Sequence, residues 1–134
     1  MISPVSFLRR PVRWLEEISR HQNVISGGPD FAYRLCTEKI SGEERQGLNL
    51  SGWRVAFSGA EPVRPDTLRR FADAFADSGF RAEAFLPCYG LAEATLMVSG
   101  GKSPGPATLK QVNASDLESH RWTHNHEAPK AQCP

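Results

Sequence analysis

The sequence predicts an α/β fold in which a partial parallel sheet carries packed helices. Short apolar or β-branched runs alternate with segments whose apolar residues recur at helical spacing, and each run closes on a turn that contains Gly or Pro. Alternation of this kind favours parallel strands joined by crossover helices. We therefore expect the order helix, strand, helix, strand, helix, strand, turn, strand.

Composition bounds the class of protein. The 134 residues suffice for one domain, and 40% hydrophobic with 23% charged residues are typical of a globular chain. Sixteen basic against 15 acidic residues give a net charge of +1, which predicts no nucleic-acid or membrane-surface binding. The apolar runs are too short for a membrane span. Three cysteines without a pairing pattern, and no apolar leader segment, favour a reducing, cytoplasmic setting.

Two short helices and a strand are predicted first. Ser3 can cap a helical turn that begins at Pro4, and Pro11 suits the first position of a second helix. The apolar face of this second helix consists of Trp14, Leu15 and Ile18. A β-branched strand follows at residues 23–26 and ends at the turn 27–29.

The next helix is predicted from about Pro29 to Ile40, where an apolar stripe recurs at helical spacing. The stripe consists of Phe31, Ala32, Leu35, Cys36 and Ile40. The polar residues 41–49 include two glycines and predict a loop or a single helical turn.

The clearest helix of the chain begins near Pro65 and Asp66 and ends at Ser78-Gly79. Its apolar face consists of Leu68, Phe71, Ala72, Phe75 and Ala76. A strand at Trp53 to Phe57 precedes it, and strands at Ala84 to Pro87 and Thr95 to Ser99 follow it.

The composition changes after Gly101. Lys102 to Pro134 contains four prolines and few large apolar residues, which predicts a loop-rich segment with a short helical piece near 114–119. We therefore divide the chain into residues 1–101 and 102–134. The tail also contains the possible metal ligands His120, His124, His126 and Cys133. Zinc sites normally show tighter paired spacing, so a solvated loop is the favoured alternative.

Three turns follow the predicted strands directly, at residues 26–29, 58–62 and 89–93. Ligands of parallel sheets lie beyond the carboxyl ends of the strands, so these turns would meet in one crevice if the strands are neighbours. In the last turn Tyr89 offers a flat face, and Glu93 offers oxygen atoms to a cation or a ribose. The structural alternative is a strand, a tight turn and a helix start, with Glu93 in the first helical turn.

These turns carry a resemblance. Tyr89-Gly90-Leu91-Ala92-Glu93 resembles the Tyr-Gly-x-Thr-Glu motif of adenylate-forming enzymes, and Ser58-Gly59-Ala60-Glu61-Pro62 resembles the loop that borders adenine in them. With the blocks at 10–15 and 26–33, the chain is similar to fatty acyl-AMP ligases from about Ser3 to Gly101. Four ordered blocks make this resemblance far more specific than one motif.

The resemblance implies a role for each turn. Tyr89 would stack on adenine within the nucleotide motif that includes Gly90, Leu91 and Ala92. Ser58, Gly59, Ala60, Glu61 and Pro62 would form the other wall of the adenine slot, largely through backbone. Glu93 would act catalytically as the ligand of the magnesium that neutralises the phosphates of ATP. The acyl pocket would be bordered by Ser26, Gly27, Gly28 and Phe31.

The implied reaction converts a fatty acid and ATP to acyl-AMP and pyrophosphate, after which an acyl carrier protein accepts the acyl group. The segment 102–134 lies where acyl-AMP ligases carry an insertion that acyl-CoA ligases lack. An acyl-CoA ligase fragment is one alternative. Another is a non-catalytic binding or assembly module that complements a separately encoded remainder of the domain.

Some features depart from the family pattern. Ala92 replaces a Thr, as is frequent in acyl-AMP ligases, and Asp30 stands where the family usually has Asn. A carboxylate there is unfavourable unless it is paired or faces solvent. The phosphate-binding loop, the ribose-binding Asp and the C-terminal catalytic Lys are missing, so we expect an internal piece of the large N-terminal domain that is inactive alone.

Overall fold

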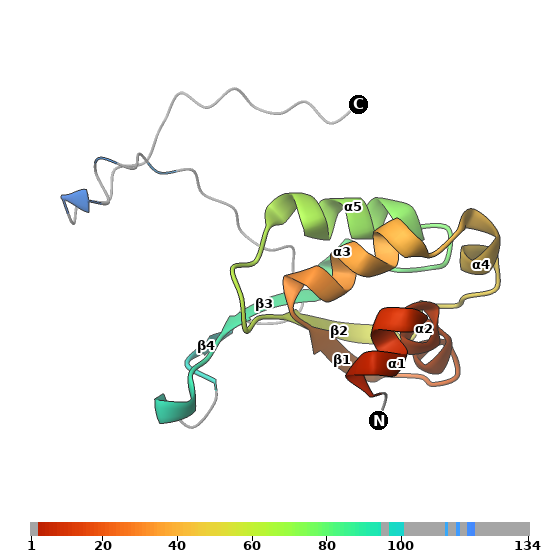
Figure 1. Cartoon of the computed structure of the whole chain (residues 1–134), viewed down its shortest axis with the longest axis horizontal. Coiled ribbons are helices and arrows are strands. Elements are labelled where there is room, and N and C mark those ends of the chain that lie inside the picture. Colours follow the sequence, from red (N-terminus) through yellow and green to blue (C-terminus); the bar gives the residue numbers. More distant parts are fainter. Residues whose placement is uncertain (1–2, 95–96, 101–111, 113–114, 116–117, 120–134) are drawn as a thin grey trace.

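The structure is a computed structural model, and it describes residues 3–94, 97–100, 112, 115 and 118–119. Helices, short 3-10 turns and strands alternate along the chain (Figure 1). In chain order they are α1 (Pro4–Arg9), α2 (Val12–Ser19), β1 (Val24–Gly28), α3 (Asp30–Lys39), α4 (Gly42–Gln46), β2 (Trp53–Ser58), α5 (Pro65–Phe75), η1 (Ala82–Ala84), β3 (Phe85–Tyr89), η2 (Ala92–Ala94) and β4 (Ser99–Gly100).

The strands form one sheet in the order β1-β2-β3-β4. β1, β2 and β3 are parallel neighbours, and β4 runs antiparallel to β3. This confirms the predicted α/β class and a mainly parallel sheet. The prediction of a strand from Thr95 to Ser99 is wrong in extent, because Met97 and Val98 lie outside β4 and residues 95–96 are not described.

Local hydrogen bonds explain where the short helices begin. The Ser3 hydroxyl accepts from the Ser6 amide at 3.3 Å and caps α1, as predicted. Ser41 and Glu44 form a reciprocal capping box that starts α4, so the polar segment 41–49 does contain a helical turn. β1 continues through Gly27 and Gly28, which the sequence placed in a turn.

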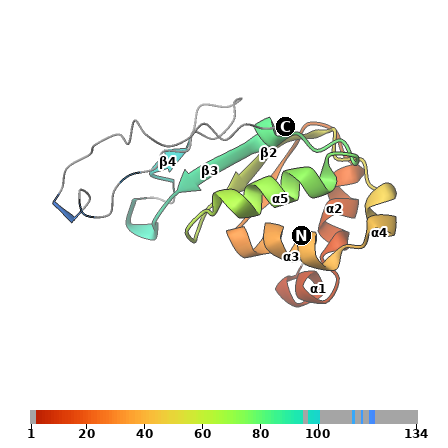
Figure 2. The same ribbon diagram turned by 90° about the horizontal axis from the view of Figure 1, so that it is seen from above.

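The helices lie on one side of the sheet (Figure 2). Tyr33 is at the centre of the core between them, with no exposed surface, although the predicted stripe of α3 omits it. Its hydroxyl donates to the Phe57 carbonyl at 2.7 Å, so its polar end is satisfied. Four rings surround it at centroid distances of 5.2 to 6.3 Å: Trp14, Trp53, Phe71 and Phe85.

The other face of the sheet is apolar and partly open. The register pairs Ile25 with Val55 and Phe57 with Leu86, so these side chains share that face. Ile25 is 70% exposed and Phe57 38% exposed. Parallel sheets are usually covered on both faces, so an open apolar face of this kind is unusual.

The predicted division at residue 101 falls where little of the chain is described. Within the tail, the Ser119 amide donates to the Ser115 carbonyl at 3.3 Å, which is the i to i+4 bond of a helical turn. The proposed metal ligands of the tail lie outside the described residues.

Candidate functional site

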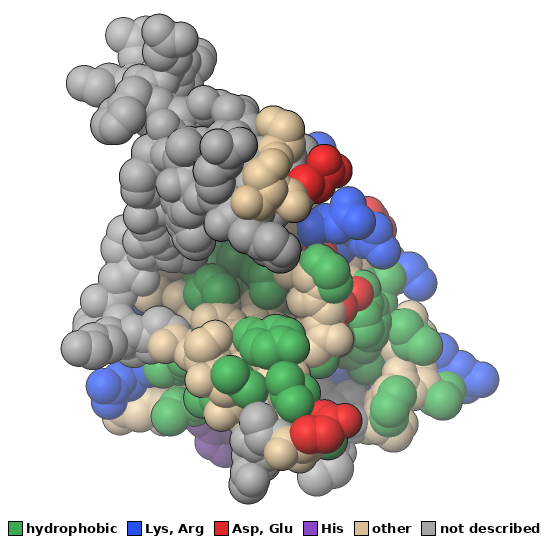
Figure 3. Space-filling view, turned by 90° about the vertical axis from the view of Figure 1, so that its left-hand side faces the viewer, with side chains coloured by type: hydrophobic (Ala, Val, Ile, Leu, Met, Phe, Trp, Pro, Cys, Tyr) green, Lys and Arg blue, Asp and Glu red, His purple; other side chains and the backbone are tan. Residues whose placement is uncertain are grey.

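Three turns meet at one edge of the sheet. The register places Gly28 beside Ser58 and Ser58 beside Pro87, so β1 and β2 end at the same level and β3 extends two residues further, to Tyr89. The predicted convergence of the turns is therefore present in the structure. Figure 3 shows this end of the molecule, with apolar side chains near its middle and basic side chains toward its outer parts.

The turn after β2 packs closely on the end of β3. A side-chain carbon on Gly59 would lie 2.7 Å from the Cys88 carbonyl oxygen and 2.8 Å from its sulfur, so only glycine fits there. Ala60 follows with a φ of 67°, a conformation that residues other than glycine seldom adopt. Ser58 to Pro62 and the Tyr89 motif are thus brought together largely through backbone.

Tyr89 ends β3 and is 60% exposed, so its ring is available to a planar ligand. Its carbonyl accepts from the Val98 amide at 2.9 Å, which fixes the backbone beneath the ring. Gly90 and Leu91 lead into the 3-10 turn that contains Ala92 and Glu93. The expected geometry of strand, tight turn and helix start is present, and the Glu93 side chain is exposed.

An apolar groove of about 580 Å³ runs along β1 and is bordered by all four residues predicted for the acyl pocket, Ser26, Gly27, Gly28 and Phe31. Its other lining residues are Pro4, Phe7, Trp14, Glu17, Ile18, His21, Val24, Ile25, Pro29 and Ala32. The Trp14 indole N–H donates to the Ser26 hydroxyl at 3.0 Å and orients the wall that α2 provides. Neither the turn after β2 nor the Tyr89 motif lines this groove.

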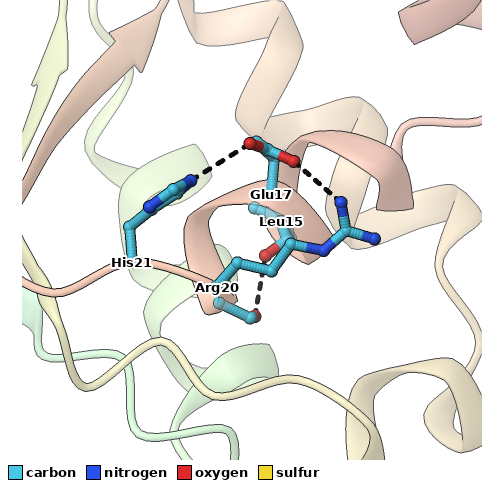
Figure 4. A network of polar contacts seen from close by, with 5 residues as sticks. Leu15, Glu17, Arg20 and His21 are labelled. Atoms are coloured by element: carbon cyan, nitrogen blue, oxygen red, sulfur yellow. Dashed lines mark hydrogen bonds and ion pairs between the residues drawn. The ribbon is translucent and has the colours of Figure 1, made fainter.

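Two lining residues of the groove, Glu17 and His21, belong to a polar network at the end of α2 (Figure 4). The Glu17 carboxylate lies 3.1 Å from the His21 ring nitrogen and accepts from Arg20 at 3.1 Å. The hydrogen bond with His21 is the main cause that lowers the pKa of Glu17 below 4.5, and Arg20 adds to it. The lining of the groove therefore combines apolar side chains with the Glu17 carboxylate.

Two carboxylates form hydrogen bonds between the segment after β1 and the segment after β2. Glu61 Oε1 accepts from the Phe31 amide at 2.6 Å. In return, Asp30 accepts from the Arg64 amide at 2.8 Å and from the Thr67 hydroxyl at 2.9 Å. Asp30 is only 5% exposed, and these bonds pair its carboxylate, so its burial is not unfavourable. The sequence marked Asp30 only as a departure, because contacts 30 or more residues apart leave no local pattern.

The Ser58 hydroxyl, at the same edge of the sheet, differs from the other polar groups of the site in its hydrogen bonding. The Ser58 hydroxyl is completely buried and has no hydrogen-bond partner among the described residues. Buried hydroxyls without a partner are unusual in native proteins, and strain, a catalytic role or a bound water or ion accounts for those that occur. No sequence pattern singled out this side chain from its neighbours in the turn.

The family resemblance implies a magnesium ligand only at Glu93. Mg²⁺ usually binds one or two carboxylates together with phosphates and waters, so one exposed carboxylate beside the nucleotide motif suits it. No group of three or more His, Cys, Asp or Glu side chains within the described part of the chain is arranged to hold a metal alone. Nor does any helix there have the length and apolar character to cross a membrane.

The chain is similar in sequence to a known protein family and to individual members of it. Residues 1–117 match the family described as AMP-binding enzyme. The chain is 45% identical, over 98% of its length, to the medium-chain-fatty-acid–acyl-carrier-protein ligase JamA of Moorena producens. A similar ligase, TtuA of Teredinibacter turnerae, is 40% identical over 90% of the chain. The chain spans 22% and 19% of these two proteins.

Solved structures of adenylate-forming proteins are similar to this chain. The fatty acyl-adenylate ligase from L. pneumophila, in complex with acyl adenylate and pyrophosphate, matches with a TM-score of 0.82 and 46% identity, over 96% of this chain and 23% of that one. An adenylation domain of a keto acid-selecting peptide-synthetase module, bound to keto acyl adenylate, matches with a TM-score of 0.65 and 26% identity, over 72% and 18% of the two chains. The chain thus belongs to the family of AMP-binding enzymes.

Proposed function

We propose that this chain is the part of an ATP-dependent fatty-acid-adenylating enzyme that forms one side of the nucleotide site and one border of the acyl groove. In this reaction the fatty carboxylate attacks the α-phosphorus of ATP, pyrophosphate leaves, and the acyl group of acyl-AMP passes to a carrier protein. The relatives named as fatty-acid–acyl-carrier-protein ligases support the substrate class. The alignment of Gly28, Ser58 and Pro87 carries the proposal, because it places the three motif turns at one edge.

The nucleotide side would consist of two parts. Tyr89 is exposed at the end of β3 and would stack on adenine, an interaction that contributes about 1–3 kcal/mol per base in other base-binding proteins. Gly90, Leu91 and Ala92 would carry the backbone past the base. The turn 58–62 would form the opposite wall, and the close approach of Gly59 to Cys88 supports this because it narrows the space between the two segments.

Glu93 would hold the magnesium ion. When bound, that ion supplies the positive charge that neutralises the phosphates during the in-line attack. Glu93 contributes a carboxylate on a 3-10 turn directly after the adenine platform. Substitution of Glu93 is therefore expected to weaken catalysis far more than nucleotide stacking.

The acyl side would be the groove along β1. Its volume of about 580 Å³ falls within the range of roughly 300–1,000 Å³ that is usual for small-molecule sites. Gly27 and Gly28 leave room beside the strand, and Phe31 lines the end near the sheet edge. A medium-chain acyl group, the substrate in the names of two relatives, suits a groove of this size.

A segment exchange tests the proposal. The matching segment of the JamA ligase, 132 aligned residues, is replaced by this chain, and ATP–pyrophosphate exchange is measured with a medium-chain fatty acid. We expect activity from the exchanged enzyme, a loss of about 100-fold or more when Glu93→Ala is added, and none from the 134-residue chain alone. A folded but inactive exchange, judged by its thermal transition, would sink the proposal.

The same enzyme distinguishes the two ligase classes. Acyl-AMP is offered either coenzyme A or an acyl carrier protein, and the acylated product is identified by mass. Transfer to the carrier protein supports the acyl-AMP ligase assignment, with residues 102–134 as its distinguishing insertion. Transfer to coenzyme A supports the acyl-CoA ligase alternative.

One observation favours a second function. Ile25 and Phe57 expose apolar surface on the open face of the sheet, as expected of a module that docks with the remainder of a domain. Size-exclusion chromatography and the binding of a hydrophobic dye distinguish a module that needs a partner from a chain that does not. A monodisperse monomer that binds no dye would argue against a missing partner.

We also propose a reducing, cytoplasmic setting for the enzyme. Cys36 and Cys88 are both free thiols, and Cys36 is wholly buried in the core. Mass measurement of the protein from its native cells would reveal whether Cys88 is oxidised there, which would contradict this setting.

A further inference from the structure

Glu61 belongs by sequence to the turn assigned to adenine, but its side chain serves the acyl side. Its Oε1 accepts from the Phe31 amide at 2.6 Å, and Phe31 lines the apolar groove. The Tyr89 motif, the other half of the nucleotide side, contributes no residue to that groove. Glu61 is therefore a direct link between the two proposed substrate sites.

The hydrogen bond between the Phe31 amide and the Glu61 carboxylate has the geometry and setting of a strong bond. The first amides of a helix have no partner within the helix, and Phe31 is the second residue of α3. A carboxylate suits such an amide, because both the charge and the helix dipole favour the bond. The length of 2.6 Å is at the short end for hydrogen bonds of this kind.

A second bond pair runs in the opposite direction. Asp30, the residue before Phe31, accepts from the Arg64 amide and the Thr67 hydroxyl at the start of α5. The turn after β2 thus provides a carboxylate to the second amide of α3, and α3 provides one to the amide that precedes α5 and to the Thr67 hydroxyl. Because the link is reciprocal, α3 cannot shift along the sheet without breaking bonds in both directions.

We propose that Glu61 is a positioning residue for the acyl substrate: its carboxylate fixes the backbone at Phe31 and so sets how the Phe31 ring borders the groove. This rests on the proposed function, in which the groove along β1 takes a fatty acyl chain. Phe31 is 39% exposed, and its ring lies against the Phe7 ring at a centroid distance of 6.5 Å. Loss of the Glu61 bond frees this wall of the groove and leaves the Tyr89 platform in place.

The test compares four forms of the 134-residue chain: wild type, Glu61→Ala, Glu61→Gln and the control Glu83→Ala. Gln keeps an oxygen that accepts from the Phe31 amide. Glu83 is an exposed carboxylate in η1, away from the groove. Two quantities are measured: the hydrogen-exchange rate of the Phe31 amide by NMR, and the dissociation constants of a fluorescent medium-chain fatty acid and a fluorescent ATP analogue.

In Glu61→Ala we expect Phe31 amide exchange to rise by about tenfold or more and fatty-acid affinity to fall by roughly 5- to 30-fold. Nucleotide affinity should change by less than about twofold, since the turn 58–62 would border adenine through its backbone, which Ala retains, and the Glu61 carboxylate bonds to Phe31 and not to Tyr89. Glu61→Gln should restore most of both losses, and Glu83→Ala should match wild type. This split between two ligands, with rescue by Gln, is not expected from general destabilisation.

Unchanged Phe31 exchange in Glu61→Ala would overturn the link. Equal weakening of both ligands, or failure of Gln to rescue, would overturn the acyl-specific role, and so would a wild-type chain that binds no fatty acid. The segment exchange with the JamA ligase judges the proposed function separately, because its activity depends on the whole assembled site. If Glu61→Ala does not fold, Asp30→Asn replaces it, and the same split between ligands is expected in weaker form.

Discussion

Gly27 lies directly against Phe57 on the neighbouring strand. A side-chain carbon on Gly27 would collide with the Phe57 carbonyl oxygen and would lie 2.6 Å from the ring carbon Cγ. The two residues are register partners of β1 and β2, so the collision involves backbone that cannot move alone. Gly27 is thus required by the sheet itself, and it also leaves the groove open beside it.

Gly27→Ala is therefore expected to lower the free energy of unfolding by about 1–3 kcal/mol, as in other overpacked sites. Urea unfolding measures the change. Gly42→Ala is the matched control, because nothing lies within 4 Å of the added carbon at the start of α4. The control should be neutral or slightly more stable. Equal unfolding midpoints for the two variants would contradict this account of the strand pair.

Cys36 makes stability sensitive to alkaline pH. Burial raises its pKa from 9.0 to about 12, so the thiol stays protonated in the folded chain at pH values where it ionises in the unfolded chain. Its contribution is complete below pH 9 and is lost as the pH rises toward 12, with a slope of up to about 1.4 kcal/mol per pH unit. Burial also raises the pKa of Tyr33, which adds a loss in the same direction above pH 10.

Cys36→Ala should flatten the decline of unfolding free energy between pH 9 and 10.5, as measured by urea unfolding at several pH values. Leu35→Ala on the same helix is the control, because it removes half-buried apolar surface and no ionisable group. The control should be less stable throughout and keep the wild-type slope. Identical slopes in Cys36→Ala and wild type would show that this thiol does not set the pH response.

The sequence predicted the elements with strong local patterns. The apolar repeat of α5 and the β-branched run of β1 gave their positions within a few residues, since both depend on neighbours in the chain. The capping box of Ser41 and Glu44 is also a local signal, and it could have identified α4 more firmly than as one option. For the site, the turn positions followed from where the strands end.

Tertiary contacts account for what the sequence could not predict. Tyr33 lies outside the expected stripe of α3, and its burial depends on a hydrogen bond to Phe57 on another strand. The bond from Phe31 to Glu61 spans 30 residues, so it gives no local pattern. β4 has two residues and forms only because it pairs with Cys88 and Tyr89, which no propensity of its own would predict.

Glu17 offers a direct test of the polar network beside the groove. His21→Ala removes the hydrogen bond that chiefly lowers its pKa, so the pKa of Glu17 should rise toward 4.5. NMR titration of the Glu17 side-chain carboxyl measures the shift. Arg69→Ala breaks the ion pair with Asp66 elsewhere on the surface, and it should leave the Glu17 titration unchanged. A Glu17 midpoint that does not move in His21→Ala would contradict the assigned contact.

Ser58 and Ser78 form a matched pair of buried hydroxyls with opposite expectations. Ser78 is 6% exposed and donates to the Arg45 carbonyl at 2.9 Å, so Ser78→Ala should lower the free energy of unfolding by about 1 kcal/mol. Ser58 is fully buried without a partner, so Ser58→Ala removes an unsatisfied group and should raise that free energy by about 1 kcal/mol. A loss of stability in Ser58→Ala would mean that the hydroxyl has a partner, such as a bound water. A gain, together with weaker nucleotide binding, would show that the serine at this sheet edge serves the ligand at the expense of the fold.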